Sequence, residues 1–218
     1  RHAAEEPRFQ KVLAVRSDLD HDIGRFEQLK RYDSFEPGTM DHAAYGVKVL
    51  FDEGMIRRFL PDDKWDSIIY TAIAHHSDYE LPEISDPQTL LHAKLIRDED
   101  KLDNCRVKLV DSTSTFINVS EEELGTQNIT QKVYETVFEN KCILSADRVT
   151  QMDYWVSYIV YFFDINFKES FDIIAENDYL NRIIDRISYS NPVTKEQMEN
   201  IRVYMQNFIN SHTNSQSF

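Results

Sequence analysis

A histidine and an aspartate stand side by side at residues 21 and 22, and further potential metal ligands follow along the chain. The candidates are His21, Asp22, His42, His75, His76 and Asp100. Imidazole nitrogens and carboxylate oxygens together form the ligand set of many catalytic divalent-metal sites. The ordered series therefore favours a metal-dependent hydrolase as the first hypothesis.

Two of these candidates lie on segments with the periodicity of an amphipathic helix. Ile69 and Ala72 precede His76 at the spacing of one helix face, so we expect the His76 ring to point inward. His42 shares a predicted helix face with Gly46, where the missing side chain would allow a close helix approach. Both rings are therefore expected at buried helix faces.

The segment 89–110 is expected to form one long helix. Its predicted buried stripe contains Leu91, Leu95 and Leu102, and Asp100 lies on an adjacent stripe. Several helices would then present an imidazole or a carboxylate near an apolar face. Because burying such groups without partners is costly, a shared cation is one way to satisfy them together.

Each candidate also has an ordinary structural interpretation. A single histidine on an apolar face is more often a hydrogen-bonded core residue than a metal ligand. The acidic run at residues 98–100 is by itself typical of a solvated helix face. The metal hypothesis therefore depends on the combination of these residues and on their order.

The remaining pattern is helical almost throughout. Further helices are expected at residues 8–23, 39–53, 61–76, 129–141, 150–163, 168–176, 178–189 and 195–210. Gly24 would end the first helix at its C′ position, and Thr194 with Gln197 forms a capping-box pattern at the last. We predict an all-α protein, with a helical core at residues 1–110 and a C-terminal helical extension at 111–218 packed on it as one structural domain.

Composition limits the classes of partner. The chain of 218 residues has a formal net charge of −14, which argues against a large nucleic-acid footprint because phosphates would be repelled. A small phosphorylated substrate stays compatible, since a bound cation can invert the field inside one pocket. No run of about 18 apolar residues is present, so no membrane span is expected. Only two cysteines, Cys105 and Cys142, suit a reducing compartment, and we expect a cytoplasmic protein.

Five sequence blocks carry a resemblance to a known family. They are HDIGRFEQ at residues 21–28, DHAAYG at 41–46, AIAHH at 72–76, IRDEDKLD at 96–103 and FFDINF at 162–167. Together they resemble the HD-domain metal-dependent phosphohydrolases, in particular a bacterial subgroup of HDIG type. The first block is specific, and the later blocks extend the resemblance over most of the chain.

The resemblance implies an all-helical HD domain with metal ligands from several helices. We expect one or two divalent ions, and mixed nitrogen and oxygen ligands allow iron, manganese, cobalt, nickel or zinc, with magnesium favoured only if oxygen and water ligands dominate. The implied metal ligands are His21, Asp22, His42, His76 and Asp100. The implied activity is cleavage of a phosphate ester, in a nucleotide or another small molecule, by a metal-activated water.

The hypothesis of a metal-activated water gives further residues roles. Asp22 would orient or deprotonate the attacking water, while Arg25 and Lys101 would hold phosphate oxygens. For Arg25 and Lys101, a simple surface cation is a nearly equal alternative. His75 would lie behind the metal ligands or face the substrate.

One feature departs from the family pattern. The family's first histidine ligand normally lies about a helix and a turn before the His-Asp pair, which here falls before Arg1, and His2 lies too close to His21. Either a preceding segment is absent or this ligand is replaced. A non-catalytic metal- or nucleotide-binding module is therefore the alternative to an enzyme, with a purely structural helical protein as the third. The sequence identifies no substrate and leaves a homo-oligomer open.

Overall fold

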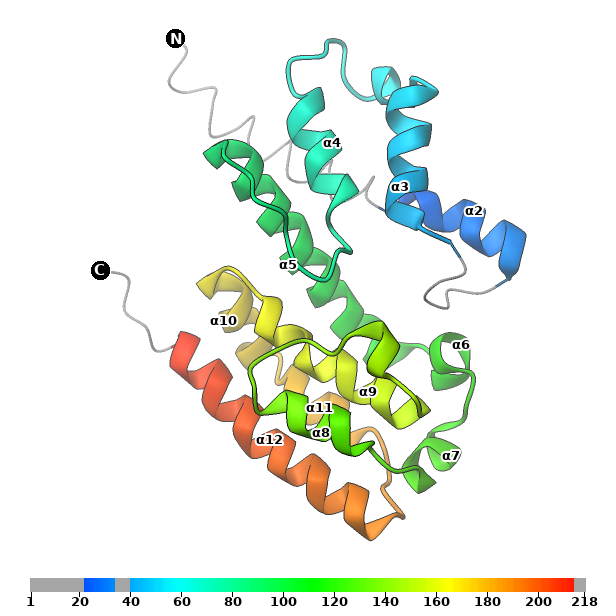
Figure 1. The fold of residues 1–218 in the computed structure, drawn as a ribbon, viewed down its shortest axis with the longest axis vertical. Helices are drawn as coiled ribbons and strands as arrows, with labels where there is room; N and C mark the ends of the chain where they lie inside the picture. Colours follow the sequence, from blue (N-terminus) through cyan, green and yellow to red (C-terminus); the bar gives the residue numbers. More distant parts are fainter. Residues whose placement is uncertain (1–21, 34–39, 214–218) are drawn as a thin grey trace. The chain divides into compact units, whose positions relative to one another are not determined.

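The computed structural model describes residues 22–33 and 40–213, and all regular elements in these ranges are helices (Figure 1). The predicted all-α class is confirmed for this part of the chain. The chain divides into two compact units, Arg1–Asp100 and Lys101–Phe218. Each unit has a hydrophobic core of its own, and the division falls within the long helix α5 (Pro87–Val110).

The first unit contains α2 (Ile23–Tyr32), α3 (His42–Val47) and α4 (Asp66–Ala74), followed by the beginning of α5. A π-helical segment at Lys48–Asp52 continues α3, and a 3-10 turn covers Met55–Arg58. In Figure 1, α3 lies between α2 and α4. The core of this unit includes Leu50, Ile69, Ala72, Ile73 and Ile96.

Gly24 lies inside a helix, so the prediction that it ends one at a C′ position is wrong. Helix α2 begins at Ile23, and residues 8–21 of the helix expected at 8–23 lie outside the described residues. A Cβ atom added to Gly24 would lie 2.0 Å from the carbonyl oxygen of His42 and 3.0 Å from the amide nitrogen of Gly46. The absence of a side chain at Gly24 thus allows the backbones of α2 and α3 to meet.

Carboxylates cap two helices of this unit. Asp41 caps α3 by accepting a hydrogen bond from the Ala44 amide at 2.9 Å. Asp86 caps α5 by accepting from the Thr89 amide at 2.8 Å. These caps fix the starts of the helices that carry His42 and Asp100.

The predicted buried stripe of α5 is wrong at Leu91, whereas Leu95 is half-buried and Leu102 packs against the core of the second unit. Leu91 is 43% exposed, whereas His92, Ala93 and Arg97 are buried. The apolar pattern failed because the buried face of α5 includes polar side chains, and Arg97 is there satisfied by backbone carbonyl groups.

The second unit surrounds the buried helix α9 (Gln151–Ile159), which continues as a 3-10 turn over Val160–Asp164. The other helices are α6 (Thr113–Ile117), α7 (Glu121–Thr126), α8 (Gln131–Val137), α10 (Lys168–Glu176), α11 (Tyr179–Asp185) and α12 (Pro192–Thr213), with a 3-10 turn at Ser145–Asp147. Met152 and Trp155 in α9 are fully buried, and α12 packs beside α10 and α11 (Figure 1). The short helices α6 and α7 were not expected from the sequence.

The capping box of this unit is at α9, where Thr150 and Asp153 bond reciprocally. The predicted box at Thr194 and Gln197 is wrong because α12 begins earlier, at Pro192. Asn191 accepts from the Thr194 amide at 3.3 Å, and the Thr194 hydroxyl donates to the Gln127 carbonyl at 2.7 Å. The Thr194 hydroxyl, which the sequence pattern predicted to cap α12, is therefore engaged in a tertiary hydrogen bond instead.

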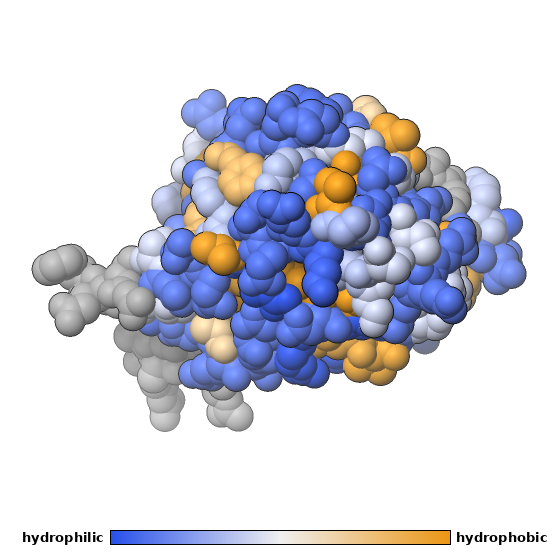
Figure 2. Space-filling model, turned by 90° about the horizontal axis from the view of Figure 1, so that it is seen from below, coloured by the Kyte–Doolittle hydropathy of each residue, from blue (hydrophilic) through white to orange (hydrophobic). Residues whose placement is uncertain are grey.

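Within the described ranges, no helix is both long enough and apolar enough to cross a membrane. On the face drawn in Figure 2, hydrophobic residues are scattered among hydrophilic ones and form no broad continuous patch.

Candidate metal centre

Three helix ends bring three potential ligands together. Asp22 is the N-cap residue of α2, His42 is the first residue of α3, and His76 follows the end of α4. The close approach of α2 and α3 at Gly24 places Asp22 beside His42. Packing of the first unit thus joins residues that lie far apart in the sequence.

The three side chains are close enough to share one cation. One ligand atom from each of Asp22, His42 and His76 lies within 4.8 Å of the others. The Nε2 atoms of His42 and His76 are 3.0 Å apart, and His42 Nε2 lies 3.6 Å from Asp22 Oδ1. These residues can therefore form a metal site with two nitrogen donors and one oxygen donor.

The surroundings of His76 fix the orientation of its ring. Its side chain is buried, and Nδ1 lies 2.7 Å from the carbonyl oxygen of Ile73. A carbonyl oxygen only accepts hydrogen bonds, so Nδ1 must carry the hydrogen, and Nε2 of the neutral ring keeps its lone pair. This is the arrangement commonly found for histidines that bind metals.

His42 is prepared for metal binding by its environment. The pKa of His42 is lowered from 6.5 to about 4, mainly by burial and also by the charges of Arg25 and His76, whereas Asp22 and Asp100 act in the opposite direction. The ring is therefore neutral at pH 7. Because Nε2 of His76 keeps its lone pair, the hydrogen of the 3.0 Å Nε2–Nε2 contact belongs to His42, and a cation bound at His42 Nε2 would displace that hydrogen.

Arg25 belongs to the same site. Its Nε atom donates to Asp22 Oδ1 at 2.6 Å, and its side chain is 29% exposed. The guanidinium thus orients the carboxylate and leaves other N–H donors for an anion. This position agrees with the predicted phosphate contact, although the contact itself stays a prediction.

The donor set fits a divalent transition metal. Two imidazole nitrogens and a carboxylate oxygen suit iron, manganese, cobalt, nickel and zinc, whereas magnesium prefers oxygen and water ligands. The hydrogen bond from His76 Nδ1 to Ile73 leaves Nε2 of His76 facing the cluster, and the lowered pKa of His42 means that a cation would meet no positive charge on that ring. The residues present therefore fit the cation that the sequence led us to expect.

Two other predicted ligands are not among these three residues. Asp100 is half-buried and close enough to His42 to raise its pKa, but it is not one of the three residues whose ligand atoms cluster. His21 lies outside the described residues. Their roles as ligands stay predictions.

Two further predicted residues have partners of their own. His75 Nδ1 lies 2.6 Å from Asp78 Oδ2 in the turn after α4. Lys101 lies in the second unit, where its buried ammonium group pairs with Asp164 at 2.7 Å. Lys101 thus has a carboxylate partner, and its predicted phosphate contact is untested.

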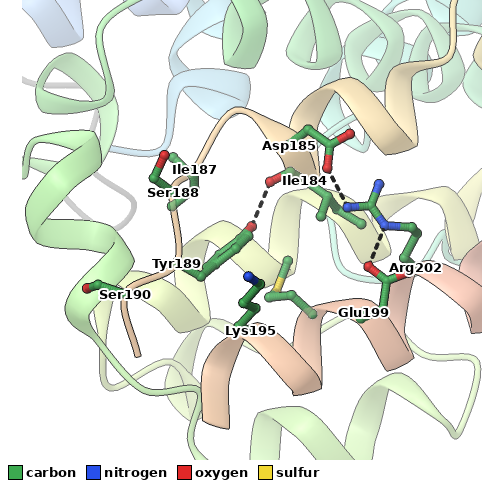
Figure 3. A pocket seen from close by; sticks show the side chains of 10 residues that line it. Ile184, Asp185, Ile187, Ser188, Tyr189, Ser190, Lys195, Glu199 and Arg202 are labelled. Atoms are coloured by element: carbon green, nitrogen blue, oxygen red, sulfur yellow. Dashed lines mark hydrogen bonds and ion pairs between the residues drawn. The ribbon is translucent and has the colours of Figure 1, made fainter. Parts of the chain in front are cut away.

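The second unit contains a separate open cavity of about 560 Å³ (Figure 3). Arg202 on its wall pairs with Asp185 at 2.5 Å and Glu199 at 2.9 Å. The Tyr189 hydroxyl donates to the Ile184 carbonyl at 2.9 Å. The charge of Arg202 is thus neutralised locally, and none of the three clustered ligands lines this cavity.

Comparison with known proteins adds no assignment. No protein-family model, curated protein or solved structure matches this chain. The functional interpretation therefore depends on the residues and geometry of the site.

Proposed function

We propose that this protein is a metal-dependent phosphohydrolase that cleaves a phosphate ester in a nucleotide or another small molecule. The observation that carries the proposal is the cluster of Asp22, His42 and His76, whose ligand atoms lie within 4.8 Å of one another. A divalent cation held there would lower the pKa of a bound water and polarise a phosphoryl oxygen. One or two ions of iron, manganese, cobalt, nickel or zinc fit the nitrogen-rich donors better than magnesium.

In this proposal some residues of the site bind the cation, and others orient the water or bind the phosphate. His42 and His76 bind through Nε2, and Asp22 binds through a carboxylate oxygen and orients the attacking water. Arg25 holds Asp22 at 2.6 Å and offers its remaining donors to a phosphate oxygen. Since Lys101 is paired with Asp164, Arg25 is the phosphate-binding cation of this proposal.

A non-catalytic metal- or nucleotide-binding module is the second candidate. The observation that favours it is the ion pair between Arg25 and Asp22, because a carboxylate oxygen that accepts from a guanidinium at 2.6 Å is less available to orient a water. Such a module would bind the same metal and phosphate groups but would not turn over a substrate.

One experiment separates these candidates. The purified chain is analysed for metals, loaded with Mn²⁺ or Co²⁺, and assayed against phosphomonoesters, phosphodiesters and nucleoside phosphates. We expect turnover that Asp22→Ala abolishes without loss of helical circular dichroism. Asp63→Ala, which removes an exposed carboxylate of the same unit, serves as the matched control and should keep full activity.

The outcomes lead to different conclusions. Metal binding without hydrolysis of any substrate supports the binding module. Equal turnover by the Asp22→Ala variant and the unaltered protein would contradict the assignment of the site. Absence of metal binding would contradict both candidates.

A further inference from the structure

A buried side chain of the next helix holds the turn that carries His76. Arg97, on α5, is 1% exposed, and its Nη1 atom donates to the carbonyl oxygens of His75 at 2.9 Å and Asp78 at 2.7 Å. The His76 carbonyl lies 3.3 Å from the same atom. Arg97 therefore binds backbone carbonyl groups of residues before and after His76 in the sequence.

These contacts provide hydrogen-bond donors for backbone carbonyl groups just beyond the end of α4. Helix α4 ends at Ala74, so the carbonyl groups of the following turn have no partners within the helix. The negative end of the helix dipole also favours a cation at this position. A guanidinium offers donors in a fixed planar array, which can hold several carbonyl groups in one arrangement.

The same contacts determine where the His76 ring lies. Nδ1 of His76 is fixed by the Ile73 carbonyl, and Arg97 fixes the backbone that follows. Arg97 also lies one helical turn before Asp100 on α5. One side chain thus sets the position of the turn bearing His76 relative to the part of α5 that bears Asp100.

We propose that Arg97 is a positioning residue of the metal centre, which holds the turn at residues 75–79 so that His76 Nε2 meets the cation shared with Asp22 and His42. This inference rests on the proposed metal role of His76. Replacing Arg97 would leave all the proposed metal ligands present. It would remove the contacts that hold the turn bearing His76 in place. Residues behind metal ligands typically contribute about ten- to a hundredfold in metal affinity.

The test measures binding of Co²⁺ to the full chain and to Arg97→Met, with far-UV circular dichroism to follow folding. The visible absorption of bound Co²⁺ reports ligand geometry, which a purely structural defect elsewhere would not change. We expect about ten- to a hundredfold weaker binding and an altered spectrum in Arg97→Met. Arg97→Lys keeps the charge and some donors, so it should recover part of the affinity.

The second unit offers a matched control. Arg186 donates to the carbonyl oxygens of Lys108 and Asp111 at the end of α5, so it also holds backbone carbonyl groups at a helix end. Arg186→Met should lower the thermal stability of the protein but leave Co²⁺ affinity within about threefold of the unaltered chain, because Arg186 contacts no metal ligand.

A double variant tests whether Arg97 acts through His76. In a His76→Ala background the aligned ring is gone, so adding Arg97→Met should change the residual Co²⁺ affinity by less than about threefold. An undiminished effect of Arg97→Met in that background would overturn the proposal.

The remaining outcomes also have defined meanings. Affinity of Arg97→Met within about threefold of the unaltered chain, with the same spectrum, overturns the proposal while leaving the metal centre intact. If Arg97→Met does not fold, the same criteria apply to Arg97→Lys. Failure of the unaltered chain to bind Co²⁺ overturns both this inference and the proposed function.

Discussion

At the scale of single residues, the candidate site is prepared before any cation binds. The Nε2 atoms of His42 and His76 are 3.0 Å apart, and the low pKa of His42 keeps its ring neutral. Two positively charged rings at this distance would repel each other, so the protein is expected to tolerate this pair only when at least one ring is neutral.

The lowered pKa of His42 predicts a pH dependence of stability in the metal-free protein. Between pH 6.5 and about 4 the unfolded chain binds a proton at His42 that the folded protein does not bind. The free energy of unfolding should therefore fall as the pH is lowered through this range, by about 3 kcal/mol at most relative to His42→Gln. Urea denaturation of both proteins in the presence of a chelator measures the difference.

The comparison with His42→Gln isolates this group, because the other titrating residues are common to both proteins. Parallel stability profiles for the two proteins from neutral to acidic pH would show that His42 keeps an ordinary pKa.

At the scale of elements, the crossing of α2 and α3 controls the site. Gly24 has no room for a side chain, since an added Cβ would lie 2.0 Å from the His42 carbonyl oxygen. Backbone atoms cannot yield as a flexible side chain can, so α2 would have to move away from α3. Asp22 and His42, which lie at the ends of these helices, would move with them.

We therefore predict that Gly24→Ala destabilises the protein by about 3 kcal/mol and weakens metal binding at least about tenfold. Gly54→Ala is the matched control. Gly54 has a φ of 76° and nothing near its missing Cβ, so this change should cost about 1 kcal/mol through backbone strain alone. Thermal unfolding and metal titration of the two variants distinguish crowding at the helix crossing from the general effect of replacing a glycine.

Asp153 has a comparable structural role in the second unit. Its buried carboxylate accepts from the amides of Thr130 at 2.8 Å, Val149 at 3.0 Å and Thr150 at 3.1 Å. It thereby joins the start of α9 to the residue that precedes α8.

Replacement of Asp153 by Ala would remove one acceptor group shared by several backbone donors. We predict a loss of about 3 kcal/mol in unfolding free energy for Asp153→Ala. Ser120→Ala removes an exposed cap that accepts a single bond, from the Glu123 amide, and should cost about 1 kcal/mol. Equal losses in urea denaturation would show that the shared contacts of Asp153 contribute nothing beyond an ordinary cap.

At the scale of the whole molecule, each unit has a hydrophobic core of its own. Cys105 belongs to the core of the second unit and is 3% exposed, and burial raises the pKa of its thiol to about 12. Cys142 is only partly buried, with its thiol donating to the Val160 carbonyl at 3.5 Å.

These environments predict different thiol reactivity. Because the thiolate is the reactive species, Cys105 should resist a thiol reagent at pH 8 in the folded protein while Cys142 reacts. Both should react in urea. Mass spectrometry of the labelled peptides identifies each site, and rapid labelling of Cys105 under native conditions would contradict the packing of this core.

Much of this arrangement follows from the sequence alone. Helical periodicity, with few glycines and prolines, predicted the all-α class, and the spacing of Ile69, Ala72 and His76 correctly predicted a buried His76. Such patterns succeed because the period of an α-helix determines which side chains share a face. The residue types likewise led to the hypothesis of a metal site. Of the predicted ligands, Asp22, His42 and His76 form a cluster in the structure.

Only the tertiary structure decided which groups meet. The contact of Gly24 with the His42 backbone and the bonds from Arg97 to the turn after α4 join segments distant in sequence, so no local pattern contains them. Contacts between distant segments also decide that Leu91 is exposed while Arg97 is buried, so the local pattern did not predict this. A polar side chain becomes stable in the interior only when partners from other elements satisfy it, and the fold alone supplies those partners.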